Sequence, residues 1–314
     1  MRRPVKRLAL VPALALALLA GSSAHALRLP AAPRCPVFPA NNPWNERVDN
    51  LPVAANSAQL IASIGLSSPV HADFGSGTWD GGPIGIPFDV VSRTTPRSRV
   101  SFEYADESDR VRYPIPRNVH IEGGPHATGD RHAILVDKSS CRLYELYDLR
   151  RTSHGWTAGS GAVWNLRSNH LRPASWTSAD AAGLPIFAGL ARWDEAARGT
   201  IDHALRFTAS QTRRAYVYPA RHYASSSDDP ALPPMGLRVR LKASVNVASF
   251  PPQARIVLRA LQHYGMILAD NGSPWYISGA PNKHWSNDQL HTLGRLTGAD
   301  FEVVDTSSLP QPGK

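Results

Sequence analysis

Several common catalytic and nucleotide-binding motifs are missing from this 314-residue chain. It has no Gly-x-Ser-x-Gly nucleophile elbow, no phosphate-binding loop, no His-Glu-x-x-His and no dinucleotide fingerprint. These absences disfavour lipase-type esterases, nucleotide-driven enzymes and zincin peptidases. The sequence also has no internal repeat and no low-complexity linker, so one domain is the expected organisation.

Long apolar runs are equally scarce. The one at residues 8 to 20 follows a basic cluster and precedes Ala24-His25-Ala26. This is the three-part form of a secretory signal peptide, and the run is shorter than the roughly 20 residues that span a bilayer. We therefore expect a signal peptide at residues 1–26 and a secreted or periplasmic mature chain that starts near Leu27 and has no integral membrane segment.

A strong basic patch is absent from the expected mature chain. Of the 34 basic residues, four lie in residues 1–26 with no acidic residue, so their removal lowers the formal charge from +9 to +5. The remaining basic residues are scattered, and no nucleic-acid-binding motif is present. We therefore expect no nucleic-acid partner.

Cysteine is limited to two residues, Cys35 and Cys141. An isolated pair in an oxidising compartment predicts one disulfide bond. Such a bond closes a loop of about 100 residues, which stabilises the fold by roughly 4 to 5 kcal/mol in the chain-entropy model. Widely separated cysteines are also atypical of structural zinc sites.

The composition of the mature region predicts a mainly β fold. The chain contains 27 prolines and 23 glycines, and short apolar stretches between these breakers are typical of strands. We expect strands within the ranges 84–91, 99–104, 132–136, 141–147, 214–218 and 237–241. The expected architecture is a single β-sandwich or jelly-roll-like domain at 27–306, followed by a flexible tail at 307–314.

Helices are expected to be few and mostly C-terminal. The range 57–64 has apolar residues on one face, and 251–264 has prolines at its start and a glycine just past its end. A third helix is expected at 287–296, where leucines are spaced three apart.

The segment RSNHLRPASWTSADAAGLPI, residues 167–186, is the first candidate for a functional loop. Asn169, Arg172 and Asp180 offer polar groups for hydroxyls or carboxylates, and Trp176 offers an apolar face for a sugar ring. The alternative is a polar connection in which Asp180 caps a turn and Trp176 packs beneath it.

A second candidate follows the expected strand at 214–218. Arg221, His222 and Tyr223 lie just beyond its end, where loops of enzymes commonly place their chemistry. Histidine and tyrosine can transfer a proton while arginine neutralises a carboxylate. This trio suits β-elimination on a uronic acid, and it equally suits an ordinary strand end at the surface.

A third candidate is ILADNGSPWYISG. Asp270 and Asn271 precede a glycine between two apolar stretches, which is typical of a hairpin turn. Trp275 offers additional aromatic area for glycan stacking.

The segment HIEGGPHATGDRH raises the alternative of a metal site. His120, His126 and His132 lie near Glu122 and Asp130, and imidazole and carboxylate groups suit zinc, iron or copper. Their spacing fits no known metal motif, so a glycine-rich connection with surface histidines is the preferred interpretation. We expect no metal and no other cofactor.

The chain also resembles a group of secreted bacterial proteins. The resemblance depends on NNPWN, GIPFDVV, SWTSADAAGLPI and YGMILADNGSPWYISG, together with shorter segments across most of the mature region. It implies one intact domain, and it implies no activity, cofactor or catalytic residue.

These patterns lead to a hypothesis of a secreted carbohydrate-active protein, a polysaccharide hydrolase or lyase with a loop-built acid/base site. Asp180 and His222 are the expected proton-transfer groups, assisted by Arg221 and Tyr223. The residues expected to bind a polysaccharide or oligosaccharide are Asn169, Arg172, Trp176, Asp270, Asn271 and Trp275. The alternatives are a non-catalytic glycan-binding or cell-envelope module and a metal-dependent enzyme. The oligomeric state has no sequence signal.

Overall fold

The computed structural model describes residues 26–313, so the expected signal peptide lies outside the described residues except for its last position. Within the described part, no helix is long and apolar enough to cross a membrane. Strands in several sheets dominate this part, and the helices are short.

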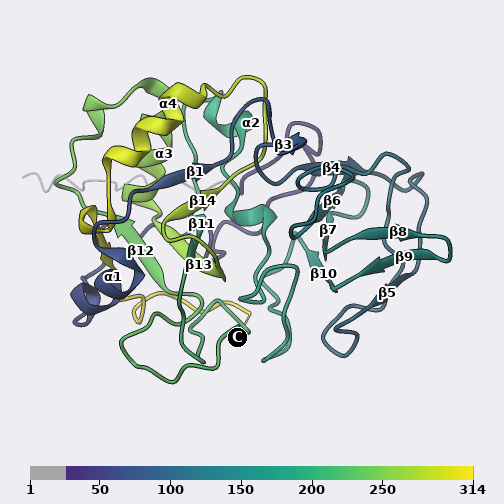
Figure 1. The fold of residues 1–314 in the computed structure, drawn as a ribbon, viewed down its shortest axis with the longest axis horizontal. Helices are drawn as coiled ribbons and strands as arrows, with labels where there is room; N and C mark the ends of the chain where they lie inside the picture. Colours follow the sequence, from purple (N-terminus) through teal and green to yellow (C-terminus); the bar gives the residue numbers. More distant parts are fainter. Residues whose placement is uncertain (1–25, 314) are drawn as a thin grey trace, which may run out of the picture.

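The larger sheet has six strands of mixed direction. Its strand order is β1 (His71–Asp73), β14 (Tyr276–Ser278), β11 (Leu205–Ala209), β13 (Met266–Asn271), β12 (Arg238–Leu241) and β15 (Phe301–Val303). β11 lies parallel to β13 and antiparallel to β14. Figure 1 shows α3 (Pro252–His263) and α4 (Asn287–His291) along one side of this sheet.

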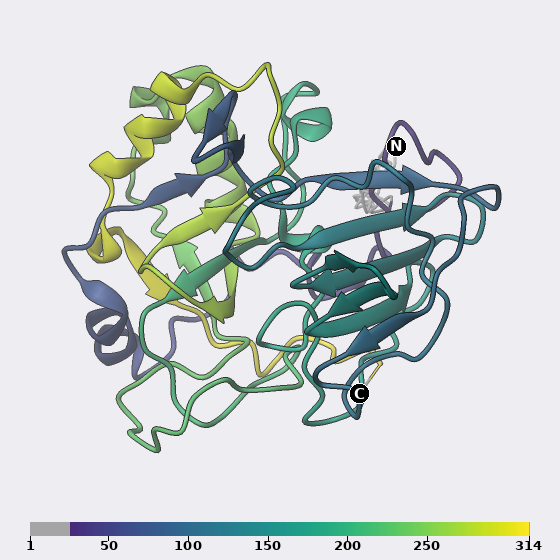
Figure 2. The same cartoon turned by 45° about the vertical axis from the view of Figure 1, so that its right-hand side comes forward.

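The second half of the molecule contains two smaller sheets. One has the order β10 (Ser160–Asn165), β7 (Arg142–Tyr147), β6 (Ala133–Asp137) and β4 (Phe88–Val91), and the other has the order β5 (Val100–Phe102), β9 (Gly155–Ala158) and β8 (Arg150–Thr152). Figure 2 shows these two sheets layered on the side of the molecule away from α3. A separate hairpin, β2 (Thr78–Trp79) and β3 (Gly82–Pro83), lies near the junction of the two halves (Figure 1).

The remaining helical elements are short and lie mainly around the six-stranded sheet. They are α1 (Ser57–Gly65), η1 (Phe187–Gly189), α2 (Trp193–Ala196), η2 (Val247–Ser249), η3 (Thr292–Arg295) and η4 (Gly298–Asp300).

β6 is buried on both faces because two hydrophobic cores meet on it. Ile134 and Val136 belong to the main core, which also includes residues of the six-stranded sheet. Ala133 and Leu135 belong to a smaller core shared with the three-stranded sheet. Successive side chains of a strand point to opposite faces, so β6 contributes to both cores. His132 directly precedes this buried strand.

The mainly β class is confirmed at the coarse level, but the expected sandwich or jelly roll is not established. The sheets combine antiparallel pairs with parallel pairs such as β4–β6 and β11–β13. Sandwiches and jelly rolls are built from antiparallel sheets.

The expected helices are present, but one expected strand and one expected hairpin do not form. α1 and α3 confirm the first two expected helices, and the third is split between α4 and η3. The expected strand at 214–218 is wrong, since Tyr216 forms only an isolated bridge to Met235. The expected hairpin around Asp270 is also wrong, because β11 lies between β13 and β14.

The disulfide Cys35–Cys141 is present, with 5.1 Å between the two Cα atoms. It ties the N-terminal segment to the residue just before β7. At the other end of the chain, the expected tail contacts the body of the protein: the Tyr218 hydroxyl donates a hydrogen bond to the Pro312 carbonyl. Its expected flexibility stays a prediction, as does the single-domain organisation.

Candidate acid/base site

A groove of about 590 Å³ opens at the edge of the six-stranded sheet. Asp73 of β1, Glu122 and Asp130 line it, and Asp80 of the β2–β3 hairpin adds a further carboxyl group. The groove is also lined by His71, Trp79, Tyr276, Asn287 and His291. We call this cavity, defined by these residues, the carboxylate groove. Its volume is within the range of small-ligand sites.

The β2–β3 hairpin forms one rim of the groove because its turn has the required residues. Trp79 pairs with Gly82, leaving Asp80 and Gly81 as a two-residue loop. Both loop residues have positive φ, 49° and 83°, which is the geometry that Asp-Gly adopts readily. The turn leaves the Trp79 residue 79% exposed at the rim.

A close backbone contact fixes the hairpin against the segment that carries Glu122. A Cβ atom at Gly82 would lie 2.1 Å from the carbonyl carbon of Gly123. Gly123 itself has a φ of +69° and Gly124 a φ of +88°, which glycine adopts without steric cost. The glycine pairs of WDGG and IEGG therefore place Glu122 beside the hairpin.

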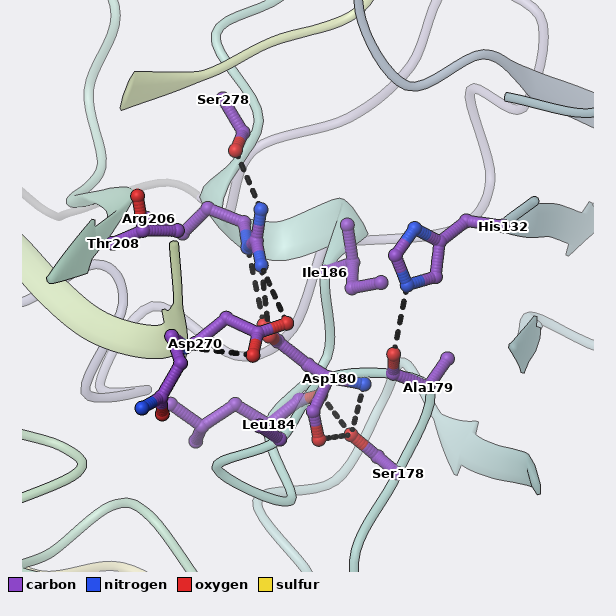
Figure 3. Close-up of polar contacts among 12 residues, drawn as sticks. His132, Ser178, Ala179, Asp180, Leu184, Ile186, Arg206, Thr208, Asp270 and Ser278 are labelled. Atoms are coloured by element: carbon purple, nitrogen blue, oxygen red, sulfur yellow. Dashed lines mark hydrogen bonds and ion pairs between the residues drawn. The ribbon is translucent and has the colours of Figure 1, made fainter. Parts of the chain in front are cut away.

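Glu122 forms a partly buried ion pair with His132, the residue before β6. The His132 Nδ1 lies 2.5 Å from Glu122 Oε2, and Nε2 lies 2.9 Å from the Ala179 carbonyl oxygen (Figure 3). Burial alone would lower the pKa of His132, but the Glu122 charge and hydrogen bond prevail and raise it to about 9. His132 is therefore an imidazolium that donates both of its protons.

The two carboxyl groups Asp73 and Glu122 have opposite pKa shifts. Burial favours a higher pKa for Glu122, but the charge and hydrogen bonds of His132 outweigh it and lower the pKa. The Asp73 residue is exposed at the end of β1, but the protein atoms that surround its carboxyl group remove enough water to raise its pKa. The negative charge of Glu122 adds to this, against the opposing effects of His71 and Arg206. The groove thus holds one ionised carboxylate and one carboxyl group with an increased tendency to keep its proton.

A buried ion network lies behind the groove, centred on Arg206 of β11 (Figure 3). Its guanidinium donates to both Asp180 oxygens, at 3.1 and 2.8 Å, and to Ser278 Oγ at 2.5 Å. The Asp270 carboxylate lies 3.5 Å away. Ser278 is the register partner of Asp73 in the β1–β14 pair, so the network supports the strand that carries Asp73.

Asp270 is the least neutralised carboxyl group of this network. Burial raises its pKa to about 7, the charge of Asp180 acts in the same direction, and Arg206 and His132 oppose them. Its side chain keeps 23% of its surface exposed, whereas the Asp180 side chain has none exposed.

Glu122, Asp130 and His132 are the residues that come nearest to a metal-ligand set in the described part of the chain. Their ligand atoms lie within 4.8 Å of one another. However, the bond from His132 Nε2 to a carbonyl oxygen requires a proton on Nε2, and the raised pKa puts a second proton on Nδ1. In this structure both ring nitrogens have partners, Nδ1 with Glu122 and Nε2 with the Ala179 carbonyl, so metal binding by His132 would require the loss of the Nδ1 proton. The metal-dependent enzyme stays an alternative.

The structure corrects the expected role of Asp180. The 167–186 and 221–223 segments do meet, since Arg221 and His222 donate backbone hydrogen bonds to the Ala182 carbonyl. But the Asp180 carboxylate is fully buried and forms an ion pair with Arg206, so no substrate reaches it. His222 Nδ1 donates to the Ala181 carbonyl instead.

The neighbours of His222 have mainly structural contacts. Arg221 Nε donates to the Arg172 carbonyl, and the Tyr223 ring stacks on His222 and Tyr216. None of Arg221, His222 and Tyr223 lines the carboxylate groove. Proton transfer by His222 and Tyr223 stays an untested prediction.

The polar residues of the 167–186 segment also stabilise their own loop. Arg172 is buried between the rings of Trp164 and Trp176 and pairs with Asp109 at 2.5 Å. Asn169 exchanges side-chain hydrogen bonds with two other asparagines, Asn41 and Asn42. These contacts within the protein use the polar groups of Arg172 and Asn169 that were expected to contact a sugar.

The residues of the third candidate segment, ILADNGSPWYISG, lie partly in the Arg206 ion network and partly in the hydrophobic core. Asp270 faces Arg206, and Asn271 Oδ1 accepts a hydrogen bond from Thr212 at 3.3 Å. Trp275 is fully buried, with stacked rings of Phe207 and Phe301 at 5.6 and 5.2 Å. The expectation that Trp275 stacks on a glycan is therefore wrong.

The three histidines of the metal alternative do not converge. His120 pairs with Asp89 at 2.6 Å, and His126 lines a different cavity from the one that Glu122 lines. Only His132 joins Glu122 and Asp130.

Asp73 and Trp79 were missed as site residues by sequence reasoning. Trp79 precedes Asp80-Gly81, a recognised hairpin signal, and could have been found from it. Asp73 ends a three-residue strand whose neighbour, β14, is two hundred residues away in sequence, and no local pattern indicates that pairing.

Comparison of the chain with family models, with curated proteins and with solved structures found no match.

Proposed function

We propose that the carboxylate groove hydrolyses glycosidic bonds, with Asp73 as the proton donor and Glu122 as the ionised partner. The observation that carries this proposal is the opposite shift of their pKa values within one groove. Glycoside hydrolysis needs one carboxylic acid to protonate the leaving oxygen and one carboxylate to act as base or nucleophile.

The roles follow from the surroundings of each group. His132 keeps Glu122 ionised and fixes its orientation through the Nδ1 contact. Asp73 lies at the solvent-accessible end of β1, where a leaving group can reach it. Asp73 gives its proton to the leaving oxygen as the glycosidic bond breaks. If Glu122 acts as nucleophile, it forms an ester with the sugar, and Asp73 regains a proton from the water that hydrolyses this ester. If Glu122 acts as base, it takes the proton of the attacking water, and both carboxyl groups then return to their starting states by exchange with solvent.

Aromatic groups at the rim support a sugar ligand. The exposed Trp79 ring offers a flat apolar surface, and His71 stacks on Tyr276 with ring centroids 4.3 Å apart. All three residues line the same groove as the carboxyl groups. Sugar rings present apolar faces that pack on aromatic side chains, while their hydroxyls require polar partners such as Asn287 and Asp130.

This proposal retains the carbohydrate-active class that the sequence suggested, but it places the acid/base pair at Asp73 and Glu122 instead of Asp180 and His222. The partner is a polysaccharide or oligosaccharide, and the place of action is outside the cytoplasm. The disulfide Cys35–Cys141 supports export, because such bonds persist in oxidising compartments.

The test is an incubation of the purified chain, residues 27–314, with a panel of polysaccharides, followed by measurement of reducing ends. We expect hydrolysis of at least one glycan, and a loss of at least a hundredfold in Asp73→Asn and Glu122→Gln. Asp106→Asn and Glu103→Gln are matched controls, because these exposed side chains lie outside the groove.

Glu122→Gln leaves His132 without its anion, so its folding is checked by circular dichroism, and Asp73→Asn serves as the second variant. Activity retained in a folded Asp73→Asn variant would contradict the assignment. Glycan binding without turnover by the unmodified chain would favour the alternative of a non-catalytic module.

A further inference from the structure

A second groove, of about 960 Å³, lies on the other side of the loop at 125–130. Its charged residues are all basic: Arg117, Arg131, Arg150 and Arg151 line it together with His126, and no carboxyl group of the described residues lines it. Trp156 of β9 and several apolar residues form the rest of the wall. We call this cavity the arginine groove.

Arg131 provides a buried positive charge without a carboxylate partner. Its Nε and Nη2 donate to the Leu149 carbonyl, and its Nη1 donates to the carbonyls of Pro125 and Ala127. Burial lowers the pKa of Arg131, the charge of Arg150 lowers it further, and the charge of Asp148 opposes both. The Arg131 guanidinium donates only to carbonyl oxygens, and Asp148 is paired with Arg150 instead. An anion in the groove would therefore reduce the cost of burying the Arg131 charge.

The other arginines leave much positive charge available to a ligand. The Arg151 guanidinium lies 4.9 Å from the centre of the Trp156 ring and has no ion pair among residues 26–313. Arg117 is exposed and has no side-chain hydrogen bond or ion pair within the same range. Arg150 shares its charge with Asp148 at 2.7 Å.

The two grooves are adjacent. Ala127 and Thr128 line both, so one short loop forms the wall between them. A chain that crosses this wall would place one unit among the arginines and the next among carboxyl groups. The arginines attract an anionic unit, whereas the exposed carboxylates of Asp80 and Asp130 in the carboxylate groove repel one.

From this arrangement we infer that the substrate is an acidic polysaccharide in which anionic units are adjacent to neutral ones, with the anionic unit bound by the arginine groove. This assignment rests on the proposed hydrolysis. Arginine suits carboxylate and sulfate groups because its planar donors bind two oxygens at once. Trp156 adds an aromatic surface for the sugar ring. A nucleic acid, with a phosphate on every unit, is disfavoured by the neighbouring carboxyl groups.

The test measures binding separately from hydrolysis. The probes are hyaluronan, which alternates uronic acid with a neutral sugar, dextran as a neutral glycan, and single-stranded DNA as another polyanion. Kd is measured by isothermal titration calorimetry with the mature chain, using short hyaluronan oligosaccharides. We expect hyaluronan to bind more tightly than dextran and DNA, and more weakly as salt rises.

The variant Arg117→Ala/Arg151→Ala is expected to weaken hyaluronan binding at least about tenfold. The matched control is Arg167→Ala/Arg259→Ala, which removes the same charge at exposed positions outside the groove and is expected to leave Kd unchanged. Unchanged binding in the groove variant, or equal weakening in both variants, would overturn the inference. Tighter binding of DNA than of hyaluronan would also overturn it, in favour of a nucleic-acid partner.

The two proposals can fail independently. If Asp73→Asn and the unmodified chain bind hyaluronan equally and neither cleaves any glycan of the panel, the proposed hydrolysis fails and the arginine groove remains as a binding site. If the chain cleaves a glycan but the loss of Arg117 and Arg151 leaves hyaluronan binding unchanged, only the assignment of the anionic unit fails.

Discussion

Arg206 and Asp180 form a bidentate ion pair. Nε and Nη2 of the guanidinium each donate to a different carboxylate oxygen, at 3.1 and 2.8 Å. The Asp180 side chain is fully buried and that of Arg206 is 5% exposed. The pair joins the 167–186 segment to β11, while Ser278 Oγ joins it to β14. Asp180 therefore supports the sheet edge from which the carboxylate groove is built.

Arg206→Ala is expected to destabilise the fold by about 3 to 5 kcal/mol, because it leaves Asp180 buried without a counterion. The measurement is the free energy of unfolding in urea. Arg214→Ala is the matched control, since Arg214 pairs with Asp228 at 2.9 Å but both side chains are largely exposed. That variant is expected to lose about 0 to 1 kcal/mol. Equal losses in the two variants would contradict the structural role of the buried pair.

Glu145 is expected to make the fold less stable as pH rises toward neutrality. Burial raises its pKa from 4.5 to about 7, against the effect of hydrogen bonds from the backbone amides of Phe187 and Ile186. Since the folded state holds the proton more tightly, this stabilising contribution is full below about pH 4.5 and is lost as pH rises through about 7.

The test compares urea unfolding at several pH values between 4.5 and 7.5 for the unmodified chain, Glu145→Gln and the exposed control Glu103→Gln. Glu145→Gln is expected to have a shallower decrease of unfolding free energy with pH, because the titrating group is gone. The control is expected to keep the original slope. An unchanged slope in Glu145→Gln would show that Glu145 titrates normally in the fold.

How far the sequence could predict this molecule depends on the range of the contacts involved. α3 was predictable because its signals are local: Pro251 and Pro252 mark its start, and Gly265 follows its end. β6 and β7 were predictable for a similar reason, as short apolar stretches between breakers. The disulfide followed from there being only two cysteines.

The wrong predictions concern residues whose position depends on contacts with segments distant in sequence. Asp270-Asn271-Gly272 has the composition of a hairpin turn, yet β11 pairs with both flanking strands and separates them. Trp275 lies in a polar segment, but its ring fills the space between Phe207 and Phe301. Neither contact has a local signal, because each depends on which strand lies next in the sheet.

In the candidate site, too, residues that are close in sequence were recognised, and a residue that depends on distant contacts was not. Glu122, Asp130 and His132 were recognised as a polar cluster because they are close in sequence, although as a metal alternative. Asp73 was not recognised, because its role depends on the β1–β14 pairing and on the nearby charge of Glu122, which is distant in sequence. Crowding of polar residues at 167–186 identified the loop that supports the groove rather than its walls.

The ion pair Glu122–His132 is expected to control the titration of His132. With Glu122 present, the pKa of His132 is about 9. In Glu122→Gln the charge is removed while burial remains, so we expect the pKa of His132 to fall below the ordinary value of 6.5. The measurement is a nuclear magnetic resonance titration of the imidazole nitrogens, and titration of His132 at the same pH in both proteins would contradict the pairing.

The same shift predicts a loss of stability at alkaline pH. The folded-state pKa of His132 lies above its ordinary value, so its contribution is full below about pH 6.5 and is lost as pH rises through about 9. Unfolding free energies between pH 6.5 and 9.5 are expected to decrease more steeply in the unmodified chain than in His132→Asn. A parallel decrease in the two proteins would contradict this prediction.

Gly82→Ala is expected to distort the carboxylate groove, because the new methyl group would lie 2.1 Å from the carbonyl carbon of Gly123. Overpacking of this kind costs about 1 to 3 kcal/mol, and here the strain separates the β2–β3 hairpin from the segment that holds Glu122. Gly129→Ala is the matched control, since Gly129 lines the same groove and an added Cβ meets nothing within 4 Å. We expect Gly82→Ala to lower the melting temperature and abolish glycan hydrolysis, while Gly129→Ala retains both. If Gly82→Ala keeps full stability and activity, the hairpin does not position Glu122, and the groove would have to be held by the Glu122–His132 pair alone.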